Sequence, residues 1–545
     1  MSKIVSNLNL DNINENIDSF KIILDVMNQE HEDIRKGGGT IAIERQHTKG
    51  RLTARERIQY LIDPNSDFFE MGIYAAYGMY KEYGSPAASG TLIGIGVVSG
   101  QECMIVANDA TVKAGAYFEV TLKKTLRAQK IALENNIPII YLVDSAGVFL
   151  PLQDQVFPDE GHFGSIFYNN ARMSALGIPQ IACVMGPCVA GGAYLPVMCD
   201  KYIIIEGASM FLAGPALVKA AIGQEIDQDT LGGANTHSAI SGTTDYHEPD
   251  DVSGLERVRK IIDHINLPTE RAFRQTEINE PAYPAQDLYK IFNPNSTGQY
   301  DILEVIARIV DGSNLEEFKS SYGKTIICGT AKIGGMNVGI VANQRKIQRS
   351  ETGEMQMGGV IYSDSSDKAA RFIMNCNQDR VPLIFIHDVN GFMVGKTSEW
   401  GGIAKDGAKM VNAVANSIVP KITLVIGGSY GAGNYALSGR AYKPRFMFAW
   451  PSAKIAVMGG DQAAKTLSQI KLAKMGDVDD DEKEKVYDDI KSMYKLQSDP
   501  RYAAARMWID EIIDPAETRK VLIRSLKVVN HQTKMPSPNF GVLQV

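Results

Sequence analysis

No stretch of this chain approaches the roughly 18 to 20 consecutive apolar residues that a membrane-spanning helix needs. Neither sign of charge dominates, since 56 basic and 63 acidic side chains give a net charge of -7 without a long tail of one sign. The opening residues, MSKIVSNLNLDNINENID, lack the apolar core of a secretory signal and the arginine-rich, acid-poor composition of a transit peptide. We therefore expect a cytoplasmic protein that binds neither nucleic acid nor a membrane.

Cysteine is scarce and shows no pattern. The chain has six cysteines, none of them in a CxxC pair, and they are scattered through apolar segments. This distribution favours buried free thiols in a reducing compartment over disulfides or a zinc site. We therefore expect no metal site.

Nucleotide-binding motifs are also missing. The glycine-rich segments GPCVAGGAY and GGSYGAG are not followed by GK(S/T), so neither is a Walker sequence. Gly94, Gly96 and Gly100 form a poor GxGxxG fingerprint, because no helical pattern follows them. These absences disfavour nucleotide binding and leave two interpretations of the glycine clusters: tight packing of a strand against a helix, or a pocket of backbone N–H groups.

The most informative positive feature is an internal repeat. Residues 137–149, IPIIYLVDSAGVF, return as residues 381–393, VPLIFIHDVNGFM, and residues 178–194, IPQIACVMGPCVAGGAY, return as residues 419–435, VPKITLVIGGSYGAGNY. Two copies in one order at nearly constant separation indicate a duplicated fold. Such a fold offers two similar sites for two different ligands, which suits a reaction that joins two small molecules.

The length agrees with the duplication, because 545 residues exceed what one hydrophobic core usually supports. A charged helical arm is expected over residues 11–62. We place the first domain at residues 1–266, a linker rich in Pro, Asn and Gln at 267–312, and the second domain at 313–545.

Each domain is expected to contain a strand hairpin, a helix, a buried strand ending in a glycine bend, a second helix and a second such strand. Buried strands separated by helices are typical of an α/β fold. Near the end of the chain, the mixed-charge residues 471–495 are most simply a solvated helix or loop. Helices are expected around residues 503–512 and 516–527.

Glycine clusters at residues 186–192 and 427–433 each follow an apolar strand and precede a helix. This arrangement leaves backbone N–H groups unpaired, and the lack of side chains allows a ligand to approach them closely. Such a pocket can bind a phosphate, or it can stabilise an oxygen that gains negative charge during a reaction.

Side-chain catalysts are harder to find. Ser145 lacks the GxSxG context of a nucleophile elbow, and the nearest histidine, His162, lies at an expected helix start. His387 corresponds to a valine in the first copy, which favours a structural histidine over a general base. Asp144 and Asp388 could act as acid and base, although an aspartate beside glycine at a strand end more often caps or turns the backbone.

Several long motifs resemble those of one enzyme family. In the first half these are KGRLTARERI, VDSAGVFLP, HFGSIFYN, FLAGPALVKAA and LGGANTHSAISGTTDY; in the second they are GGIAKDGAKM, VPKITLVIGGSYGAGNYALSGRAY, FAWPSAKIAVMGGDQAA and DEIIDPAETR. Over residues 49–524 the chain looks like the carboxyltransferase β subunit of biotin-dependent acyl-CoA carboxylases. Within that family, GGSYGAGNY followed by GRAY is similar to the 3-methylcrotonyl-CoA carboxylase branch.

The resemblance implies a crotonase-like superhelix in each half, with acyl-CoA bound mainly by the first half and carboxybiotin mainly by the second half of a neighbouring subunit. It also implies a homo-hexamer built as a trimer of dimers, and an alpha subunit that carries biotin carboxylase and the biotin carrier domain. Biotin would be attached to that partner, which alone would use ATP. Coenzyme A would enter as part of the acyl-CoA substrate.

The family's motifs also suggest site residues. The candidate catalytic amides are those of Ala190, Gly191 and Gly192 in one pocket and of Ala432 and Gly433 in the other. The residues expected to bind the ligands are Gly147, Phe392, Tyr435, Lys49, Arg51 and Arg55. Among these, Gly147 would line the first pocket, Tyr435 would help to select the acyl group, and the three basic residues are candidates for the CoA phosphates by charge alone.

One segment departs from the methylcrotonyl pattern. Residues 344–363, QRKIQRSETGEMQMGGVIYS, are longer than expected there, and SDKAARF after them is similar to propionyl-type enzymes. The acyl group therefore stays open between 3-methylcrotonyl, propionyl, geranyl and longer chains. A crotonase-type hydratase or decarboxylase acting alone and a non-catalytic scaffold are the competing classes.

Overall fold

The computed structural model describes residues 2–8, 13–295, 298–475 and 479–544. Three predictions fall partly outside these residues, namely the start of the chain, the linker at 296–297 and the charged segment at 476–478. The chain divides into two compact units. The first-copy unit comprises Gln29–Glu270 and Ala504–Met507, and the second-copy unit comprises Met1–Asn28, Arg271–Ala503 and Trp508–Val545.

The start of the chain belongs to the second-copy unit, whereas the expected domains follow sequence order. Strand β1 (Ser2–Lys3) explains this, because it pairs antiparallel with β10 (Asn314–Glu317). The expected helical arm consists of α1 (Ile13–Arg35), α2 (Thr40–Thr48) and α3 (Ala54–Leu61). Helix α3 begins with a capping box, in which Thr53 and Glu56 exchange hydrogen bonds between side chain and backbone.

The first-copy unit is built on one eight-stranded sheet. Its strands are β2 (Phe69–Met71), β3 (Thr91–Val98), β4 (Gln101–Asn108), β5 (Ile139–Ser145), β6 (Gln180–Val189), β7 (Lys201–Ile205), β8 (Ser209–Phe211) and β9 (Tyr246–Glu248). Their order is β2-β3-β4-β5-β6-β7-β9, and β8 pairs with the far end of β6. The hairpin β3–β4 is antiparallel, and the strands from β4 onward pair in parallel.

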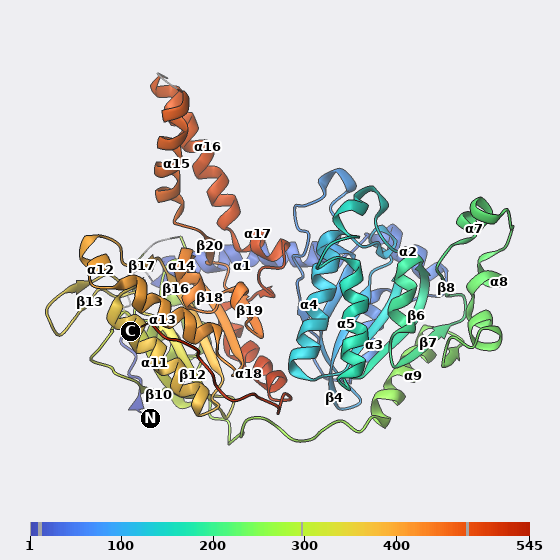
Figure 1. The fold of residues 1–545 in the computed structure, drawn as a ribbon, viewed down its shortest axis with the longest axis horizontal. Helices are drawn as coiled ribbons and strands as arrows, with labels where there is room; N and C mark the ends of the chain where they lie inside the picture. The colour runs from blue at the N-terminus through green and yellow to red at the C-terminus, as the bar shows by residue number, and fades with distance from the viewer. Residues whose placement is uncertain (1, 9–12, 296–297, 476–478, 545) are drawn as a thin grey trace. The chain divides into compact units, whose positions relative to one another are not determined.

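Helices cover this sheet and separate its parallel strands. They are α4 (Glu119–Asn135), α5 (Phe163–Ala175), α6 (Tyr194–Val197), α7 (Pro215–Ile222), α8 (Gln228–Gly232) and α9 (Asp251–His264). Figure 1 shows α4 and α5 side by side over the strands, and every residue of β5 is buried. This layering confirms the predicted α/β class, because a parallel sheet buried on both faces needs apolar strands joined by helices.

The second-copy unit repeats the same sheet. Its strands are β10, β11 (Ile326–Ile333), β12 (Met336–Asn343), β16 (Leu383–Val389), β18 (Lys421–Tyr430), β19 (Phe446–Ala449), β20 (Lys454–Ala456) and β21 (Glu511–Ile512). They follow the order β10-β11-β12-β16-β18-β19-β21, with β20 on β18 and with β1 added at the edge. Each strand of the first sheet therefore has a counterpart in the same position, as a duplicated fold requires.

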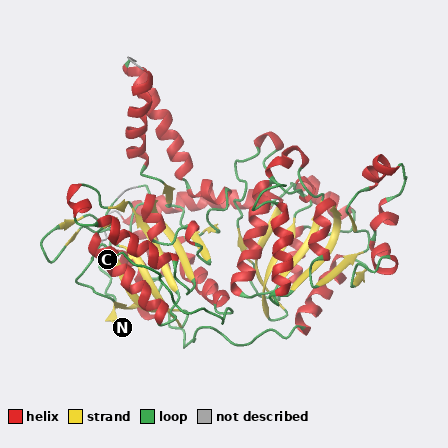
Figure 2. Cartoon of the chain, in the orientation of Figure 1, coloured by secondary structure: helices red, strands yellow, loops and turns green. Residues whose placement is uncertain are grey.

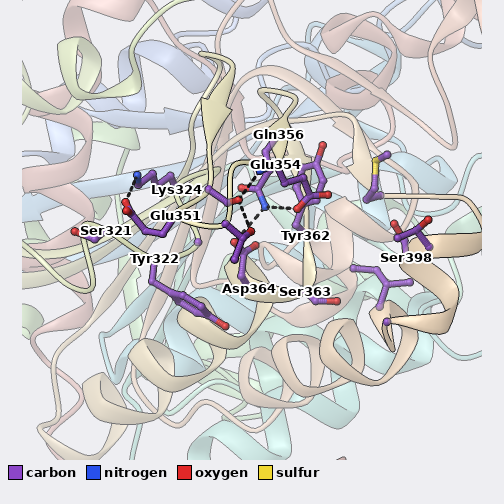
Figure 3. Close-up of a pocket in the computed structure, with 17 residues that line it drawn as sticks. Ser321, Tyr322, Lys324, Glu351, Glu354, Gln356, Tyr362, Ser363, Asp364 and Ser398 are labelled. Carbon is purple, nitrogen blue, oxygen red and sulfur yellow. Dashed lines mark hydrogen bonds and ion pairs between the residues drawn. The ribbon is translucent and has the colours of Figure 1, made fainter.

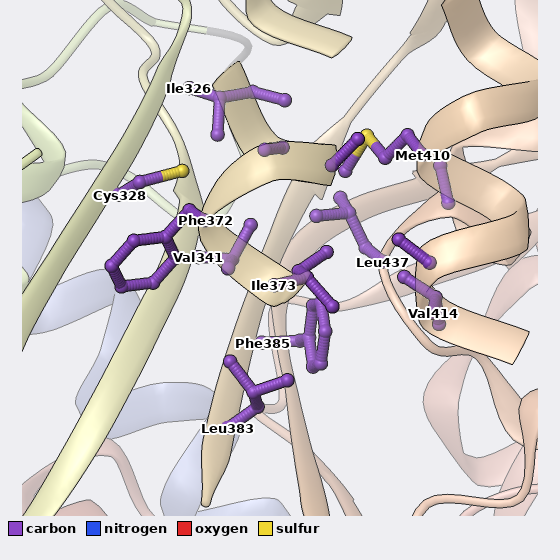
Figure 4. Packing of buried hydrophobic residues seen from close by; sticks show 14 of the residues in the cluster. Ile326, Cys328, Val341, Phe372, Ile373, Leu383, Phe385, Met410, Val414 and Leu437 are labelled. Carbon is purple, nitrogen blue, oxygen red and sulfur yellow. The ribbon is translucent and has the colours of Figure 1, made fainter. Parts of the chain in front are cut away.

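Helices α11 (Ser363–Gln378) and α13 (Ile403–Ala415) pack on the second sheet and on each other. Figure 4 shows the apolar cluster between them, with Phe372 and Ile373 from α11, Met410 from α13 and Phe385 from β16. All four side chains are at most 3% exposed. Burying each such side chain stabilises the fold by about 1.5–3 kcal/mol.

Other short elements complete this unit. They are α10 (Ile302–Ala307), β13 (Gln348–Arg349), β14 (Met355–Gln356), β15 (Val360–Ile361), β17 (Gly391–Phe392), α12 (Lys396–Trp400), α14 (Gly431–Ala436) and α18 (Thr518–Val529), and α17 (Pro500–Ala505) begins in this unit and ends in the first-copy unit. The charged segment lies in a pair of helices, α15 (Gly460–Met475) and α16 (Asp480–Ser498), which Figures 1 and 2 show standing out from this unit. Ala464, Val486 and Ile490 form the apolar contact between them.

Two details of the secondary structure differ from the prediction. The helix expected over residues 503–512 ends at Ala505, and Glu511–Ile512 form strand β21, which pairs with β19. The glycine bends also start later than expected. Strands β6 and β18 continue to Val189 and Tyr430, because their last residues pair with β8 and β20.

A contact between aspartate and glycine explains the most faithful part of the repeat. A Cβ on Gly186 would lie 2.0 Å from the Asp144 Oδ1 atom, and one on Gly427 would lie 2.4 Å from the Asp388 carboxylate. In both sheets the pairing shifts register at this aspartate. The carboxylate therefore occupies the space of the missing side chain, so aspartate and glycine must occur together.

Replacing Gly427 with alanine should therefore lower the free energy of unfolding by about 1–3 kcal/mol, because the Asp388 carboxylate must move to admit the methyl group. Gly164 is the matched control, since no atom lies within 4 Å of its Cβ position. Gly164→Ala lies in helix α5 and should stabilise the fold by about 0.5–1 kcal/mol. Urea unfolding of both variants tests the contact, and equal stabilities would contradict it.

Candidate active site

The two copies end their central strands in the same way. Strand β6 ends at Val189, and the short helical turn Ala190–Ala193 follows directly. Its first residue, Ala190, has a left-handed conformation with φ +58°. Strand β18 ends at Tyr430, and Gly431 takes φ +50° at the start of α14. The first N–H groups of a helix have no acceptor within it and carry its positive end. Each copy thus offers a short row of donors for an anionic oxygen.

The first turn contains the predicted residues Ala190, Gly191 and Gly192. Ala190 and Gly191 are exposed, and a Cβ on Gly191 or Gly192 would meet no atom within 4 Å. Gly147 lies close to this turn, because its Cβ position is 3.0 Å from the Val189 carbonyl oxygen, and its φ is +87°. The structure therefore brings these four predicted residues together, with open space beside Gly191 and Gly192.

The second turn borders a cavity of about 580 Å³. Of the predicted residues, Ala432 and Tyr435 line it, and Tyr435 is 48% exposed. Gly433 is buried instead, because its Cβ position lies 2.6 Å from the Val389 side chain. Phe392 is half-buried and packs against the apolar cluster on the sheet.

The sequence analysis placed part of the remaining cavity wall inside its glycine cluster and family motifs without giving those residues a role, namely Ser429, Gly431, Asn434, Ile455, Ala456 and Val457. It did not find Tyr494, Gln497, Tyr502 and Trp508. Tyr494 and Gln497 come from α16, which the charge pattern marked only as a solvated helix. No motif signals the aromatic residues, because they are far apart in the sequence and meet only in the folded unit.

Asp144 and Asp388 are buried under the turns, against Gly186 and Gly427. Asp144 is ion-paired with the buried Arg57 at 2.9 Å, and Arg57 also binds Asp251 at 2.7 Å. Asp388 lies 3.2 Å from the Arg345 guanidinium and accepts hydrogen bonds from the Tyr300 hydroxyl and the Gly428 N–H. Burial raises the pKa of Asp144 and of Asp388.

These contacts favour the structural interpretation of both aspartates over acid–base catalysis. Asp144 is 2% exposed and Asp388 is 7% exposed, so neither presents a carboxyl group to solvent. The KGRLTARERI motif contains the first cation, Arg57, but nothing in the sequence pairs Arg345 with Asp388.

Ser145 is not arranged as a nucleophile. Its hydroxyl donates to the Gly115 carbonyl oxygen at 2.7 Å and accepts from the Gly147 N–H at 3.0 Å. His162 Nδ1 instead accepts a hydrogen bond from the Asp159 N–H. The hydroxyl therefore supports the loop that carries Gly147.

His387 is fully buried, as a structural histidine should be. Its Nε2 atom contacts the Leu437 carbonyl oxygen at 2.5 Å, and its Nδ1 atom contacts the Ser429 hydroxyl at 2.9 Å. Burial lowers the pKa of His387 to about 4, so the ring is neutral near pH 7.

His387 should make the protein less stable in mild acid. Between pH 6.5 and about 4 the unfolded chain binds a proton at this residue that the folded protein does not. The free energy of unfolding should then fall as the pH is lowered, by up to about 1.4 kcal/mol per pH unit from this group. Urea unfolding from pH 7 to pH 4.5 measures the slope, and His387→Val should reduce it. An unchanged slope in the variant would contradict the assignment.

The three basic residues suggested for CoA phosphates differ in their surroundings. Lys49 is exposed at the end of α2. Arg51 donates to the Gly207 carbonyl oxygen. Arg55 binds both oxygens of Glu70, at 3.0 and 2.9 Å, so its guanidinium already has a carboxylate partner.

Comparison with known proteins identifies the family. A family model described as the carboxyl transferase domain matches residues 45–543. This chain belongs to the carboxyl transferase family. The carboxyltransferase is 48% identical over 517 residues to the biotin-dependent 3-methylcrotonyl-coenzyme A carboxylase beta1 subunit of Mycobacterium tuberculosis. This alignment covers 93% of this chain and 94% of that protein. It is 47% identical over 533 residues to the probable mitochondrial methylcrotonoyl-CoA carboxylase beta chain of Drosophila melanogaster, covering 94% and 89%.

A solved structure shows the same fold. The carboxyltransferase matches the beta subunit of geranyl-CoA carboxylase from P. aeruginosa with a TM-score of 0.87 and 34% identity, over 100% of both chains. The predicted family, the enzyme class and the two tandem crotonase-like units are therefore confirmed. In the described parts of the carboxyltransferase, no helix is both long and apolar enough to cross a membrane.

Part of the segment that departs from the methylcrotonyl pattern lines a second cavity in the carboxyltransferase, of about 360 Å³ (Figure 3). The hairpin β13–β14 belongs to this segment, and Glu351 between its strands pairs with Lys324 at 2.8 Å. Gln356 donates to Asp364 at 3.1 Å. Its walls also include many hydroxyl groups, from Ser321, Tyr322, Ser350, Thr352, Tyr362, Ser363, Thr397 and Ser398. None of the predicted site residues lines this cavity.

Proposed function

We propose that this carboxyltransferase is the β subunit of a biotin-dependent acyl-CoA carboxylase and transfers a carboxyl group from carboxybiotin to 3-methylcrotonyl-CoA, giving 3-methylglutaconyl-CoA. The observation that carries the proposal is the repetition of the exposed amide turn, at Ala190 in one unit and Gly431 in the other. A transfer between two carbonyl compounds needs two such oxygen sites. The names of the relatives from M. tuberculosis and D. melanogaster support the acyl group.

The chain's own contribution is electrostatic. Carboxybiotin, when bound, would supply CO2 and a ureido nitrogen basic enough to remove a proton from the acyl-CoA. In the first-copy unit, the amides of Ala190, Gly191 and Gly192 would stabilise the thioester oxygen as it becomes an enolate or dienolate. In the second-copy unit, the amide of Ala432, which lines the cavity, would stabilise the ureido oxygen, whereas Gly433, the other residue expected there, is buried against Val389. No side-chain base is needed, which agrees with the buried aspartates.

The second cavity wall fits a biotin ring. The space of about 580 Å³ lies directly beside the amides at the start of α14. Tyr435, Tyr494 and Trp508 give it aromatic walls, and such walls suit a compact, mostly apolar bicyclic ligand. We therefore assign the second-copy unit to biotin and the first-copy unit to acyl-CoA, with Gly147 beside the thioester. Tyr435, which the resemblance suggested for selecting the acyl group, is assigned to the biotin side instead, because it lines this cavity.

The remaining parts of the proposal concern partners. An alpha subunit with biotin carboxylase and biotin carrier domains would deliver the biotin and would use the ATP, and the chain would form a hexamer as a trimer of dimers. The expected place is the cytoplasm, where the six free cysteines of the chain would stay reduced. Geranyl-CoA is the second candidate substrate, because the structural match to the geranyl-CoA carboxylase subunit spans both chains.

A panel of CoA esters tests the function. The carboxyltransferase is mixed with its biotin-bearing partner, ATP and bicarbonate, and carboxylated products are measured for 3-methylcrotonyl-, propionyl- and geranyl-CoA. We expect 3-methylcrotonyl-CoA to give the highest kcat/KM. A preference for geranyl- or propionyl-CoA would change the assigned substrate. If none of the esters gave a carboxylated product, the proposed enzymatic function would be wrong.

A further inference from the structure

The segment that departs from the methylcrotonyl pattern brings a cation to the buried aspartate of the second copy. This cation is Arg345, whose Nε atom lies 3.2 Å from Asp388 Oδ2, and both side chains are only 10% exposed. Its Nη1 atom donates to Asn390 Oδ1 at 3.3 Å. In the first copy the cation comes from helix α3 instead, where Arg57 pairs with Asp144. The two copies therefore obtain the cation for the repeated aspartate from different parts of the chain.

The end of this segment is packed tightly around Arg345. A Cβ on Gly358 would lie 2.0 Å from the Arg345 carbonyl oxygen, and one on Gly359 would lie 2.3 Å from its Nη1 atom. Gly359 also has φ +75°, and its carbonyl oxygen accepts from the Asn390 N–H at 2.7 Å. Two consecutive glycines are therefore needed where the segment returns to the guanidinium.

The surroundings of Asp388 favour its ionised form only while Arg345 is present. Oδ1 accepts from the Gly428 N–H and Oδ2 accepts from the Tyr300 hydroxyl, both at 2.8 Å. Burial raises the pKa of Asp388, and the charge of Arg345 is the largest influence that lowers it. Without the cation, a carboxylate at this depth would be a buried unpaired charge.

Both charges act directly at the second turn. Asp388 binds the N–H of Gly428, which lies three residues before Gly431 in the chain. Burial and the charge of Asp388 raise the pKa of Tyr430, whereas the charge of Arg345 lowers it. Tyr430 directly precedes Gly431, at which the turn begins. The negative and positive charges therefore reach the same place and offset each other there.

We infer that Arg345 is a positioning residue of the carboxyl transfer, because it neutralises Asp388 beneath the second turn. This inference rests on the proposed function, in which the amides of that turn stabilise negative charge on the biotin oxygen. An unpaired carboxylate under the turn would oppose this charge and weaken the positive potential of the amides. Arg345 acts through Asp388, and the departing segment is the part of the chain that supplies it.

The pH dependence of turnover tests this role. We would measure kcat from pH 6 to pH 9 with 3-methylcrotonyl-CoA, the biotin-bearing partner, ATP and bicarbonate. In Arg345→Gln the pKa of Asp388 should rise, because burial remains and the cation is gone. As the pH rises and Asp388 loses its proton, the kcat of the variant relative to wild type should fall about tenfold. The KM for the CoA ester should stay unchanged.

The other titratable groups near Asp388 do not change charge over this range. In the described part of the unit they are Tyr300 and Tyr430, which act on the carboxylate, and His387, its neighbour in the chain. Burial raises the pKa of both tyrosines and lowers that of His387 to about 4. Adding Asp388→Asn to Arg345→Gln removes the unpaired charge, so the double variant should regain most of its turnover and the wild-type pH profile.

Arg519→Gln is the matched control. Arg519 pairs with Asp311 at 2.7 Å, and both side chains are less than 10% exposed. Asp311 accepts from the N–H groups of Gly334 and Gly335 before strand β12, at the opposite end of the sheet from Asp388. This variant should lose thermal stability without a fall in relative kcat between pH 6 and pH 9.

Two results would show that the inference is wrong while the proposed function stands. One is a relative kcat of Arg345→Gln that does not change with pH, and the other is a loss that Asp388→Asn does not restore. If the wild type carboxylates none of the CoA esters, the proposed function fails, and the role of Arg345 in it fails as well.

Discussion

Gly191→Val should reduce carboxylation at least about 100-fold without unfolding the protein, because its side chain would fill the space in which the thioester oxygen meets the amides. The fold should tolerate the substitution, since no atom lies within 4 Å of the Cβ position of Gly191 and its φ is not in the left-handed region. The large effect follows from charge development on the enolate oxygen, because removal of one oxyanion donor typically lowers turnover by about 10² to 10³.

Turnover and thermal unfolding, measured on the same preparation, test this result. Gly164→Val is the control, because it also adds a side chain into open space but lies in helix α5 of the same unit. We expect both variants to unfold near the wild-type midpoint and only Gly191→Val to lose activity. Wild-type turnover in Gly191→Val would remove Gly191 from the proposed oxyanion site.

Ala432→Asp should lower turnover about 100-fold or more relative to Ala432→Asn, which has nearly the same shape. Ala432 is exposed at the start of α14 and lines the cavity assigned to biotin. A fixed carboxylate there would repel the developing charge on the ureido oxygen and compete for the same amides. An aspartate near a helix N-terminus is otherwise favourable, so the substitution should not lower the free energy of unfolding.

The two variants differ only in charge, and this separates electrostatics from crowding. The KM for the CoA ester should be similar in both, because the first-copy unit is unchanged. Because Ala432 is exposed, raising the salt concentration should screen the added charge and recover part of the activity of the aspartate variant. Equal turnover in the aspartate and asparagine variants would contradict an anionic ureido oxygen at this turn.

The fold could be predicted well from the repeat. Strands β5 and β16 begin with apolar runs, at 139–143 and 383–386, and both strands are buried along their whole length. This pattern is local, because a strand buried on both faces is mostly apolar. The ends of the strands and helices could be predicted less well from the sequence. Whether β6 stops at Met185 or continues to Val189 depends on its pairing with β8, which lies farther along the chain.

The candidate site divides in the same way. The backbone turns at Ala190 and Gly431 could be predicted from the sequence, since glycine and other small residues directly after a strand indicate them. The cavity walls could not be predicted, because Tyr494 and Trp508 carry no signal until α16 and the segment after α17 fold against the turn. Gly433 shows what the motif cannot distinguish. A glycine there suggested an amide open to a ligand, but the structure needs glycine at this position because a side chain would collide with Val389.

By itself, the sequence determined the duplication, the α/β class, the family and the two backbone turns, because these depend on residues close together in the chain. Only the tertiary structure decided how Asp144 and Asp388 are used, since their cations and glycines come from distant segments. It also decided that His387 is a structural residue. Its Nε2 donates to the Leu437 carbonyl oxygen and its Nδ1 accepts from the Ser429 hydroxyl, and only folding brings these partners from distant segments to the ring.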